Sequence, residues 1–394
     1  MAVRLPFVVH SSDCHVVEPP DLWTPRIDKK WLGREPRIQH LEDTDIWVVD
    51  KDVRMAVVGI QDQAGFRFED PTKISKKARM DDLARGNAGW EPLLYMKGMD
   101  EDGVYGAVIY PSEATQAFRV IRGELLDALS KTYNDWMMDE FCMAAPERLK
   151  CVAMINVDDV DVAVKEMYRT AKKKTCAAHM LPVFPAHPKT YDMPEFDPIW
   201  AAAEEIGLPI VFHLGTNKKA FSHEPALDLV VHATKDIHIQ RSLASIVMGG
   251  VFTRHPKAKC GAIEFGASWL APLMLNCDRL MEEYEDELPK YPDGEKPSDH
   301  FRRNVFASFQ DDPAAVELRD IVGVENLQWG NDYPHAEATF PFSHKFLQSQ
   351  LEGVPDEEAA MIAGGNTAKM YGFAEPSAEA KKALGMPEPK GAML

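Results

Sequence analysis

The stretch Ser12-Asp13-Cys14-His15-Val16-Val17-Glu18 follows the short β-branched run Phe7–Val9 and indicates how the chain folds and what it binds. Side chains two positions apart on a strand share a face, so Asp13 and His15 point the same way and can hold one metal ion. Glu18, in the following loop, can fold back to offer a further carboxylate. The alternative is that Asp13 and His15 form a loop-capping pair and that Glu18 is a solvated rim residue.

Short β-branched runs recur along the chain and, from about residue 100 onward, alternate with longer amphipathic stretches. This alternation predicts βα units around a parallel sheet, and eight strands is the number in a TIM barrel. The predicted strands are Phe7–Val9, Val104–Tyr110, Cys151–Asn156, Ala177–Phe184, Pro209–His213, Lys259–Glu264, Val305–Phe309 and Leu327–Trp329. The predicted helices are Arg122–Met143, Val160–Lys173, Pro198–Ile206, Ile237–Phe252, Leu270–Glu285, Ala314–Ile321 and Glu357–Met370. We therefore predict an α/β fold, a distorted TIM (β/α)8 barrel with an insertion after the first strand.

The insertion covers residues 24–95, where the barrel pattern is interrupted. Ile46–Val49 and Val53–Val58 flank Asp50-Lys51-Asp52, which predicts a hairpin. An insertion after the first strand lies at the catalytic face of a barrel, so it can serve as a lid or partner surface, or be a plain scaffold hairpin. We expect one barrel domain over 1–373, with 24–95 as a rim insertion and 374–394 as an extended or disordered C-terminal arm.

Composition narrows the classes of function. A formal net charge of -18 repels nucleic acid and anionic membrane, so neither is an expected partner. The chain shows no apolar run of membrane-spanning length and no small-residue cleavage site after its N-terminal apolar patch, so we expect a cytoplasmic protein. The six cysteines are scattered without a C-x-x-C pair, which indicates reduced core residues.

Three further predicted strands end in residues able to bind a metal: His213, Glu264 and Asp332. Each has a plainer alternative, since a strand-end histidine is often structural and a strand-end carboxylate often caps the next helix. The ends of parallel barrel strands meet on one face, however, and four strands from first to last end in such residues. This agreement favours a shared metal site.

Together with Asp13-Cys14-His15, seven other stretches resemble the amidohydrolase-related group that includes aminocarboxymuconate semialdehyde decarboxylase and the resorcylate-type decarboxylases. They are Met99-Asp100-Glu101-Asp102-Gly103-Val104, Tyr133-Asn134-Asp135-Trp136, Pro146-Glu147-Arg148-Leu149, Phe196-Asp197-Pro198-Ile199-Trp200, Arg254-His255-Pro256, Asn331-Asp332-Tyr333-Pro334-His335 and Gly365-Asn366-Thr367-Ala368. The resemblance implies that Asp13, His15 and His213 are metal ligands. It also implies that Asp332 is a ligand or the general acid/base, and we place Asp332 and His213 in the catalytic set.

The sequence departs from this group in two places. The decarboxylase type presents a histidine followed by glycines after its sixth strand, whereas this chain has Glu264-Phe265-Gly266. Many hydrolases of the superfamily bridge two metals through a carboxylated lysine on the fourth strand, but Cys176–Leu181 contains no lysine. A two-metal site would therefore need another bridge.

The predicted donors are rich in carboxylates, which suit iron or manganese better than zinc and favour a dinuclear centre. His15-Val16-Val17-Glu18 is also similar to the H-x-x-E element of amidohydrolase-related oxygenases such as aminoisobutyrate hydroxylase. In that interpretation His238, at a helix start, supplies the second metal; a surface histidine is its alternative, and His232 is a weaker competitor. The complete predicted ligand set is Asp13, His15, Glu18, His213, His238, Glu264 and Asp332.

These patterns leave three functions open. The favoured one is a dinuclear Fe/Mn monooxygenase that hydroxylates an unactivated C–H bond of a small carboxylate-bearing substrate. For it the resemblance implies a ferredoxin-type electron donor and a homologous subunit or homo-oligomer. The alternative is a mononuclear Zn or Mn decarboxylase or hydrolase, in which the metal is a Lewis acid and Asp332 moves protons. The third, a degenerate barrel that partners an active homologue, is disfavoured by the intact ligand constellation.

Overall fold

Eight parallel strands form the centre of the molecule in the computed structural model, which describes residues 4–84, 89–216, 229–284, 289, 291–292 and 294–385. Their order in the sheet follows the chain: β1 (His10–Val16), β5 (Gly106–Pro111), β6 (Leu149–Met154), β7 (Cys176–Leu181), β8 (Ile210–His213), β9 (Cys260–Ile263), β10 (Val305–Phe309) and β11 (Leu327–Trp329). Between β1 and the loop after β11, backbone N–H groups of His15 and Asp332 donate to Tyr333 and Asp13. The predicted TIM barrel is confirmed.

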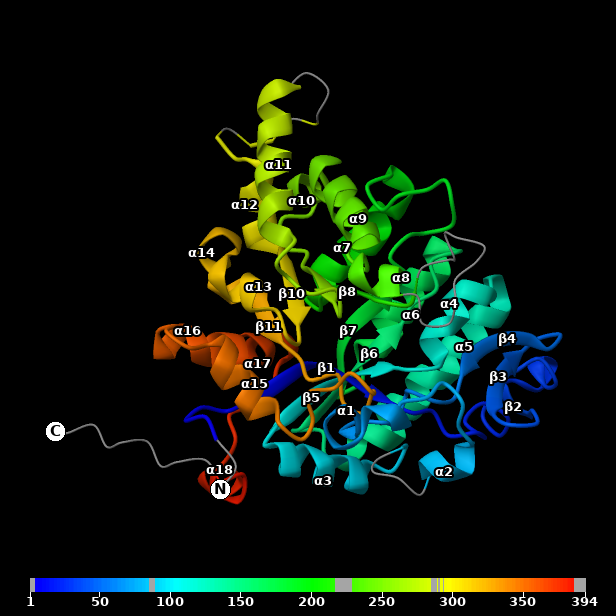
Figure 1. Ribbon diagram of the computed structural model, residues 1–394. Helices are drawn as coiled ribbons and strands as arrows, with labels where there is room; N and C mark the ends of the chain where they lie inside the picture. Colours follow the sequence, from blue (N-terminus) through cyan, green and yellow to red (C-terminus); the bar gives the residue numbers. More distant parts are fainter. Residues whose placement is uncertain are drawn as a thin grey trace.

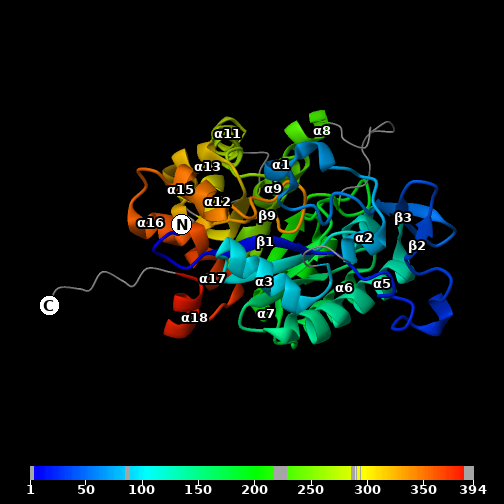
Figure 2. The same cartoon turned by 60° about the horizontal axis from the view of Figure 1, so that its bottom comes forward.

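Helices surround the sheet in both ribbon views (Figures 1 and 2). The outer layer of the barrel contains α5 (Gly123–Trp136), α6 (Val160–Thr170), α7 (Asp197–Ile206), α9 (Ile237–Met248), α10 (Val251–Arg254), α11 (Leu270–Glu283), α12 (Pro297–Asn304), α13 (Pro313–Glu317), α14 (Arg319–Val322), α15 (Ser343–Gln350), α16 (Asp356–Ala360) and α17 (Asn366–Tyr371). The other helices are α1 (Phe66–Glu69), α2 (Met80–Ala84), α3 (Pro92–Asp102), α4 (Ala117–Val120), α8 (Leu229–Ala233) and α18 (Ala378–Ala383). All seven predicted helices are found, some of them divided.

The first strand lies later than predicted, because β1 begins at His10 and the run Phe7–Val9 precedes it. A polar sequence can form this strand because its hydroxyl groups have buried partners. Ser11 Oγ lies 3.1 Å from Asn331 Oδ1, and Ser12 Oγ donates to the carbonyl of Trp329 at 3.0 Å. The barrel thus provides hydrogen-bond partners for the serine hydroxyl groups, although polar residues of this kind do not indicate a buried strand when only apolar runs are considered.

The rim insertion contains the predicted hairpin and one more strand. β2 (Arg37–His40), β3 (Asp45–Val49) and β4 (Val53–Val57) form an antiparallel sheet, which Figure 1 places beside α5. Trp23 and Trp47 pack edge to face with ring centroids 5.5 Å apart, and Trp23 Nε1 donates to the carbonyl of Leu129 in α5 at 3.2 Å. Two buried indoles therefore attach the insertion to the barrel.

The later part of the insertion reaches the loop that carries Asp332. The N–H of Ala64 donates to Pro334 O at 3.0 Å, and the N–H of Ala336 donates to Ile60 O at 2.9 Å. Arg67 donates to the carbonyl of Glu337 at 2.5 Å. The insertion is thus hydrogen-bonded to the C-terminal face of the barrel, as expected for a segment that follows the first strand.

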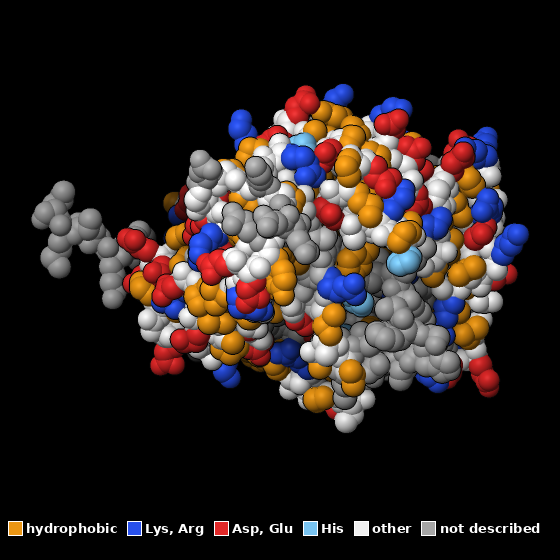
Figure 3. All heavy atoms as spheres, turned by 90° about the horizontal axis from the view of Figure 1, so that it is seen from above, with side chains coloured by type: hydrophobic (Ala, Val, Ile, Leu, Met, Phe, Trp, Pro, Cys, Tyr) orange, Lys and Arg blue, Asp and Glu red, His pale blue; other side chains and the backbone are white. Residues whose placement is uncertain are grey.

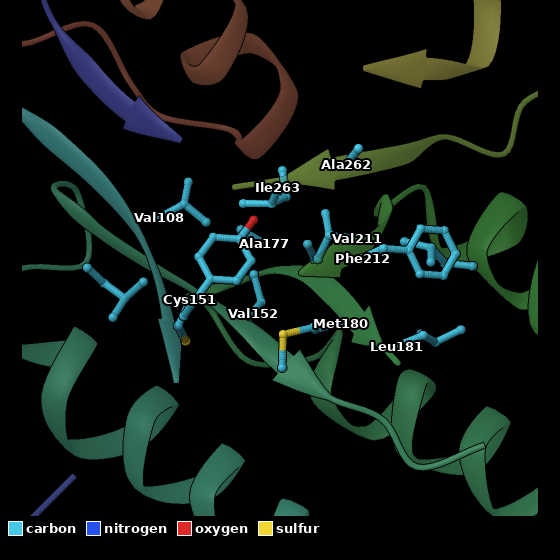
Figure 4. Packing of buried hydrophobic residues seen from close by; sticks show 14 of the residues in the cluster. Val108, Cys151, Val152, Ala177, Met180, Leu181, Val211, Phe212, Ala262 and Ile263 are labelled. Atoms are coloured by element: carbon cyan, nitrogen blue, oxygen red, sulfur yellow. The ribbon is translucent and has the colours of Figure 1, made fainter. Parts of the chain in front are cut away.

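The core is built from apolar side chains on neighbouring strands. Figure 4 shows Val108, Val152, Val211 and Ile263 from β5, β6, β8 and β9 among these side chains, and each is buried. All six cysteines are free and buried, as predicted. Among the described residues no helix has the length and apolar character needed to cross a membrane.

The outside is charged, and acidic and basic side chains are interspersed on the face seen in Figure 3. The C-terminal segment expected as an arm over 374–394 is not extended throughout, because α18 covers Ala378–Ala383. Its first turn is capped by Ser377, whose hydroxyl accepts the N–H of Ala380 at 3.2 Å. Residues 386–394 lie outside the described part of the chain.

Candidate metal centre

Side chains of types that can bind a metal converge from four strands at the C-terminal end of the barrel. Asp13 and His15 belong to β1, His213 ends β8, Glu264 directly follows β9, and Asp332 lies in the loop after β11. In three sets of residues, the ligand atoms all lie within 4.8 Å of one another: Asp13, His15 and His213; His15, Asp332 and His335; and Asp13, Glu264 and Asp332. Because the sets share members, they surround one small region.

Hydrogen bonds to one ring nitrogen orient the two central histidines. His15 Nδ1 donates to the carbonyl of Pro111 at 3.1 Å, and Nε2 lies 3.6 Å from Asp13 Oδ1 and 3.4 Å from Asp332 Oδ1. His213 Nδ1 donates to Leu214 O at 2.8 Å, and Nε2 lies 3.3 Å from oxygens of both Asp13 and Glu264. A carbonyl on Nδ1 leaves the Nε2 lone pair free for a metal.

Two of the carboxylates sit on unusual backbone. Glu264 has φ 71° and Asp332 has φ 60°, which places both in the left-handed region. This conformation costs a non-glycine residue on the order of 1 kcal/mol and is tolerated better by Asp than by Glu. Such strain is concentrated at functional sites, so the turns after β9 and β11 mark the same place as the donors do.

A buried polar network fixes the relative positions of β1 and the Asp332 loop. The N–H of Asp332 donates to Asp13 O at 2.9 Å, and the N–H of Asn331 donates to Ser11 Oγ at 3.0 Å. The Asn331 side chain in turn donates to Asp102 Oδ2 at 3.0 Å. Asp13 and Asp332 are therefore held together by main-chain bonds that do not depend on their own carboxylates.

Burial and crowding perturb the titration of these groups. Burial and the negative charge of Asp332 raise the pKa of Glu264 to about 8. Burial, followed by the charges of Glu337 and Asp13, raises the pKa of Asp332 well above its usual value. Burial and the neighbouring His335 and His213 lower the pKa of His15 well below 6.5. Without a cation, the surroundings favour the protonated forms of Glu264 and Asp332 and a neutral His15.

The residues fit a bound divalent cation. Among the described residues, Asp13 Oδ2, His15 Nε2 and Asp332 Oδ2 have no hydrogen-bond partner although all three are buried. Buried polar atoms without partners are costly, and a cation would satisfy them. Imidazole nitrogens mixed with carboxylate oxygens suit Mn²⁺, Fe²⁺ or Zn²⁺.

The structure does not bring Glu18 or His238 into any of these sets. Both Glu18 carboxylate oxygens accept backbone N–H groups, from Glu113 at 3.0 Å and Ala114 at 3.1 Å. His238 is half-buried at the start of α9 and packs edge to face on Phe184, with ring centroids 6.1 Å apart. The competitor His232 is exposed on α8. The predicted second metal position is therefore not assembled from these residues.

Sequence reasoning missed His335, which joins one of the donor sets. Its Nδ1 lies 2.9 Å from Asp332 Oδ1, its Nε2 lies 2.9 Å from Ser112 Oγ, and its ring stacks on His15 at 3.9 Å. The sequence feature that could have indicated His335 is its position three residues after Asp332, directly after a proline. β7 is the strand on which many hydrolases of the superfamily carry the bridging lysine; here His179 Nε2 lies 3.2 Å from Thr170 Oγ1 of α6.

The barrel and its donor cluster define the class of a metal-dependent (β/α)8-barrel enzyme. The sequence profile of the family described as Amidohydrolase matches residues 13–373, and the chain belongs to this family. The expected resemblance is thereby confirmed at the level of the family.

Proteins similar to this chain in sequence or in structure include decarboxylases. A gamma-resorcylate decarboxylase of Rhodococcus jostii is 24% identical over 258 residues, which are 61% of this chain and 76% of that protein. The crystal structure of an amidohydrolase from Mycobacterium avium subsp. paratuberculosis matches with a TM-score of 0.75 at 22% identity, over 93% of this chain and 100% of the other. A manganese-bound 5-carboxyvanillate decarboxylase from Novosphingobium aromaticivorans matches with a TM-score of 0.59 at 15% identity, over 71% and 80% of the two chains. These findings favour the decarboxylase alternative over the oxygenase.

Proposed function

We propose that this chain is a non-oxidative decarboxylase that removes CO₂ from a small aromatic carboxylate and uses one divalent ion, Mn²⁺. The observation that carries the proposal is that the three donor sets share Asp13, His15 and Asp332 pairwise, so they surround one small region. A dinuclear oxygenase needs a second position from Glu18 and His238, which lie outside these sets. The reaction class, decarboxylation, is suggested by the similarity to gamma-resorcylate decarboxylases.

Asp13, His15, His213 and Asp332 would hold the ion, in agreement with the ligand roles predicted from the sequence. A divalent cation there supplies positive charge to the oxygens of a bound carboxylate and its ring substituents. The protein contributes the rest of the site. It orients both imidazoles through backbone carbonyls and surrounds the donors with buried side chains, which strengthens every charge interaction within the cluster.

The reaction requires one proton on carbon. The proton adds to the ring carbon that bears the carboxylate, the electron pair of the C–C bond returns to the ring, and CO₂ leaves. We assign the proton donor to Glu264, whose side chain is 10% exposed while those of Asp13 and Asp332 are 1% and 0% exposed. Among these carboxyl groups, it is therefore the one that an entering substrate meets. It follows β9, where the resembling decarboxylases present a histidine.

His213 and Asp332, which the sequence analysis places in the catalytic set, lie beside Glu264. Glu264 Oε2 lies 3.3 Å from His213 Nε2, so the proton donor lies directly beside the ion that His213 would hold. Asp332 Oδ1 lies 2.9 Å from His335 Nδ1, and this contact can pass a proton to the side of the site that Ser112 lines. No electron donor is required.

The proposal is tested under strict anaerobiosis. Protein loaded with one equivalent of Mn²⁺ is given gamma-resorcylate, 5-carboxyvanillate and a panel of other hydroxybenzoates, and CO₂ and the decarboxylated phenol are quantified. We expect both products in equal amounts, and a loss of about 100-fold or more in Asp332→Asn but none in the exposed control Asp320→Asn. Activity that needs O₂ and a reductant, or no CO₂ from any panel member, would refute the proposal.

A further inference from the structure

Two buried carboxyl groups form a pair next to the metal centre, at the ends of adjacent strands. Glu18 lies two residues after β1, Glu113 lies two residues after β5, and both are 0% exposed. Glu18 Oε2 accepts the N–H of Glu113, and its Oε1 accepts the N–H of Ala114. In return, the N–H of Glu18 donates to Glu113 Oε2 at 3.4 Å. The two side chains thus join the loops that follow β1 and β5.

The backbone hydrogen bonds are divided unequally between the two carboxyl groups. Glu18 receives N–H donors on both oxygens, which stabilises a carboxylate. Glu113 receives one N–H, and its Oε1 has no partner among the described residues. Burial and the negative charge of Glu18 raise the pKa of Glu113 well above its usual value. Of the two, Glu113 is therefore the carboxyl group whose neutral form the fold favours.

The loop that Glu18 holds is the loop that orients the histidines of the centre. The carbonyl of Pro111 accepts His15 Nδ1 at 3.1 Å and Thr115 Oγ1 at 2.6 Å. Ser112 Oγ lies 2.9 Å from His335 Nε2. His15 and His335 then stack with ring centroids 3.9 Å apart and an interplanar angle of 27°. A shift of residues 111–114 would turn both rings.

We propose that Glu18 is a positioning residue for the metal centre: it clamps residues 111–114 so that Pro111 holds His15 in its metal-facing orientation and Ser112 holds His335 stacked beside it. This inference rests on the proposed function for the identity of the ion. It replaces the predicted ligand role of Glu18 with an action through hydrogen bonds. Outer-shell partners of this kind set the tautomer and direction of a ligating imidazole.

The test measures Mn²⁺ binding to purified protein, with the EPR signal of unbound Mn²⁺ as the readout. In Glu18→Gln an amide NH₂ replaces one acceptor oxygen, so one of the two backbone N–H groups loses its partner. We expect one Mn²⁺ per chain as in the wild type, with the Kd raised about 10- to 100-fold. The exposed Glu352→Gln is the matched control and should bind like the wild type. Glu113→Gln, which mimics a neutral acid, should change the Kd less than Glu18→Gln does.

A second variant covers the case in which Glu18→Gln does not fold. Thr115→Val removes the other donor to Pro111 O with little change in volume, and it should also raise the Kd while the protein remains folded by circular dichroism. An unchanged Kd in the folded variants overturns the proposal. So does a wild type that binds two Mn²⁺ and a Glu18→Gln that binds one, since Glu18 is then a ligand. These measurements need no substrate, so their failure is distinct from absence of CO₂ release.

Discussion

Replacement of Glu264 by Gln should stabilise the metal-free protein, with a dependence on pH that the site explains. The pKa of Glu264 is about 8 in the fold and 4.5 when exposed, so ionisation of this side chain opposes folding. Its contribution to stability is fully present below pH 4.5 and is lost as the pH rises through 8. At one pKa unit for about 1.4 kcal/mol, the loss is about 3 kcal/mol at pH 7 and less than about 1 kcal/mol at pH 5. Gln has no proton to lose and avoids this cost.

The assay is urea unfolding of wild type and Glu264→Gln in EDTA at pH 5, 6, 7 and 8, with the exposed Glu352→Gln as control. We expect the variant to be the more stable protein at pH 7, by an advantage that shrinks toward pH 5. Added Mn²⁺ at 100 times its Kd should stabilise the wild type by about 2.7 kcal/mol. A variant no more stable than the wild type at pH 7, or an advantage independent of pH, would refute the reasoning.

Three further substitutions test other parts of the structure. Burial lowers the pKa of His10 to about 4, so the stability that this neutral histidine contributes above pH 6.5 is lost as the pH falls toward 4. At pH 5 the wild type should have lost about 2 kcal/mol of stability for this reason, and His10→Leu should avoid that loss. If the urea midpoint falls equally in both proteins between pH 8 and pH 5, the prediction is wrong. A Cβ on Gly330 would lie 2.6 Å from Asp13 Cβ, so Gly330→Ala should lower the free energy of unfolding by about 1–3 kcal/mol. It should also raise the Kd for Mn²⁺, measured by titration. An unchanged Kd would count against the close approach of β1 to Gly330. Trp23→Phe loses the hydrogen bond to Leu129, so it should lower the free energy of unfolding by about 1–2 kcal/mol. Proteolysis within residues 24–95 should also become faster. An unaltered rate of cleavage would show that other contacts hold the insertion.

Most of the barrel could be predicted from the sequence, because buried parallel strands leave short apolar runs that flank amphipathic helices. The errors lie where tertiary partners decide the structure. β1 is rich in polar residues that bond to β11 and to the loop after it, and β2 (Arg37–His40) has no apolar pattern of its own but pairs with β3. The helix predicted over Arg122–Met143 changes to a π turn at Met137–Phe141, and hydrophobic periodicity does not register such a change.

The donors that the structure brings together are those at strand ends, since their place follows directly from the barrel. Asp13, His15, His213, Glu264 and Asp332 are of this kind. Glu18 fits the H-x-x-E pattern, but the pattern does not reveal that β5 ends alongside and offers two N–H groups to its carboxylate. The position of His335 depends on the turn that follows Asp332, which spacing alone does not define.

The two main-chain hydrogen bonds between the insertion and residues 334–336 have a thermodynamic consequence. Any event that orders or displaces residues 60–64 also acts on the loop that presents Asp332, and by reciprocity a cation bound at Asp332 acts on the insertion. A change in the insertion can therefore alter cation affinity without replacing any ligand. For an engineer, residues 60–64 offer a way to adjust the metal centre from outside the barrel.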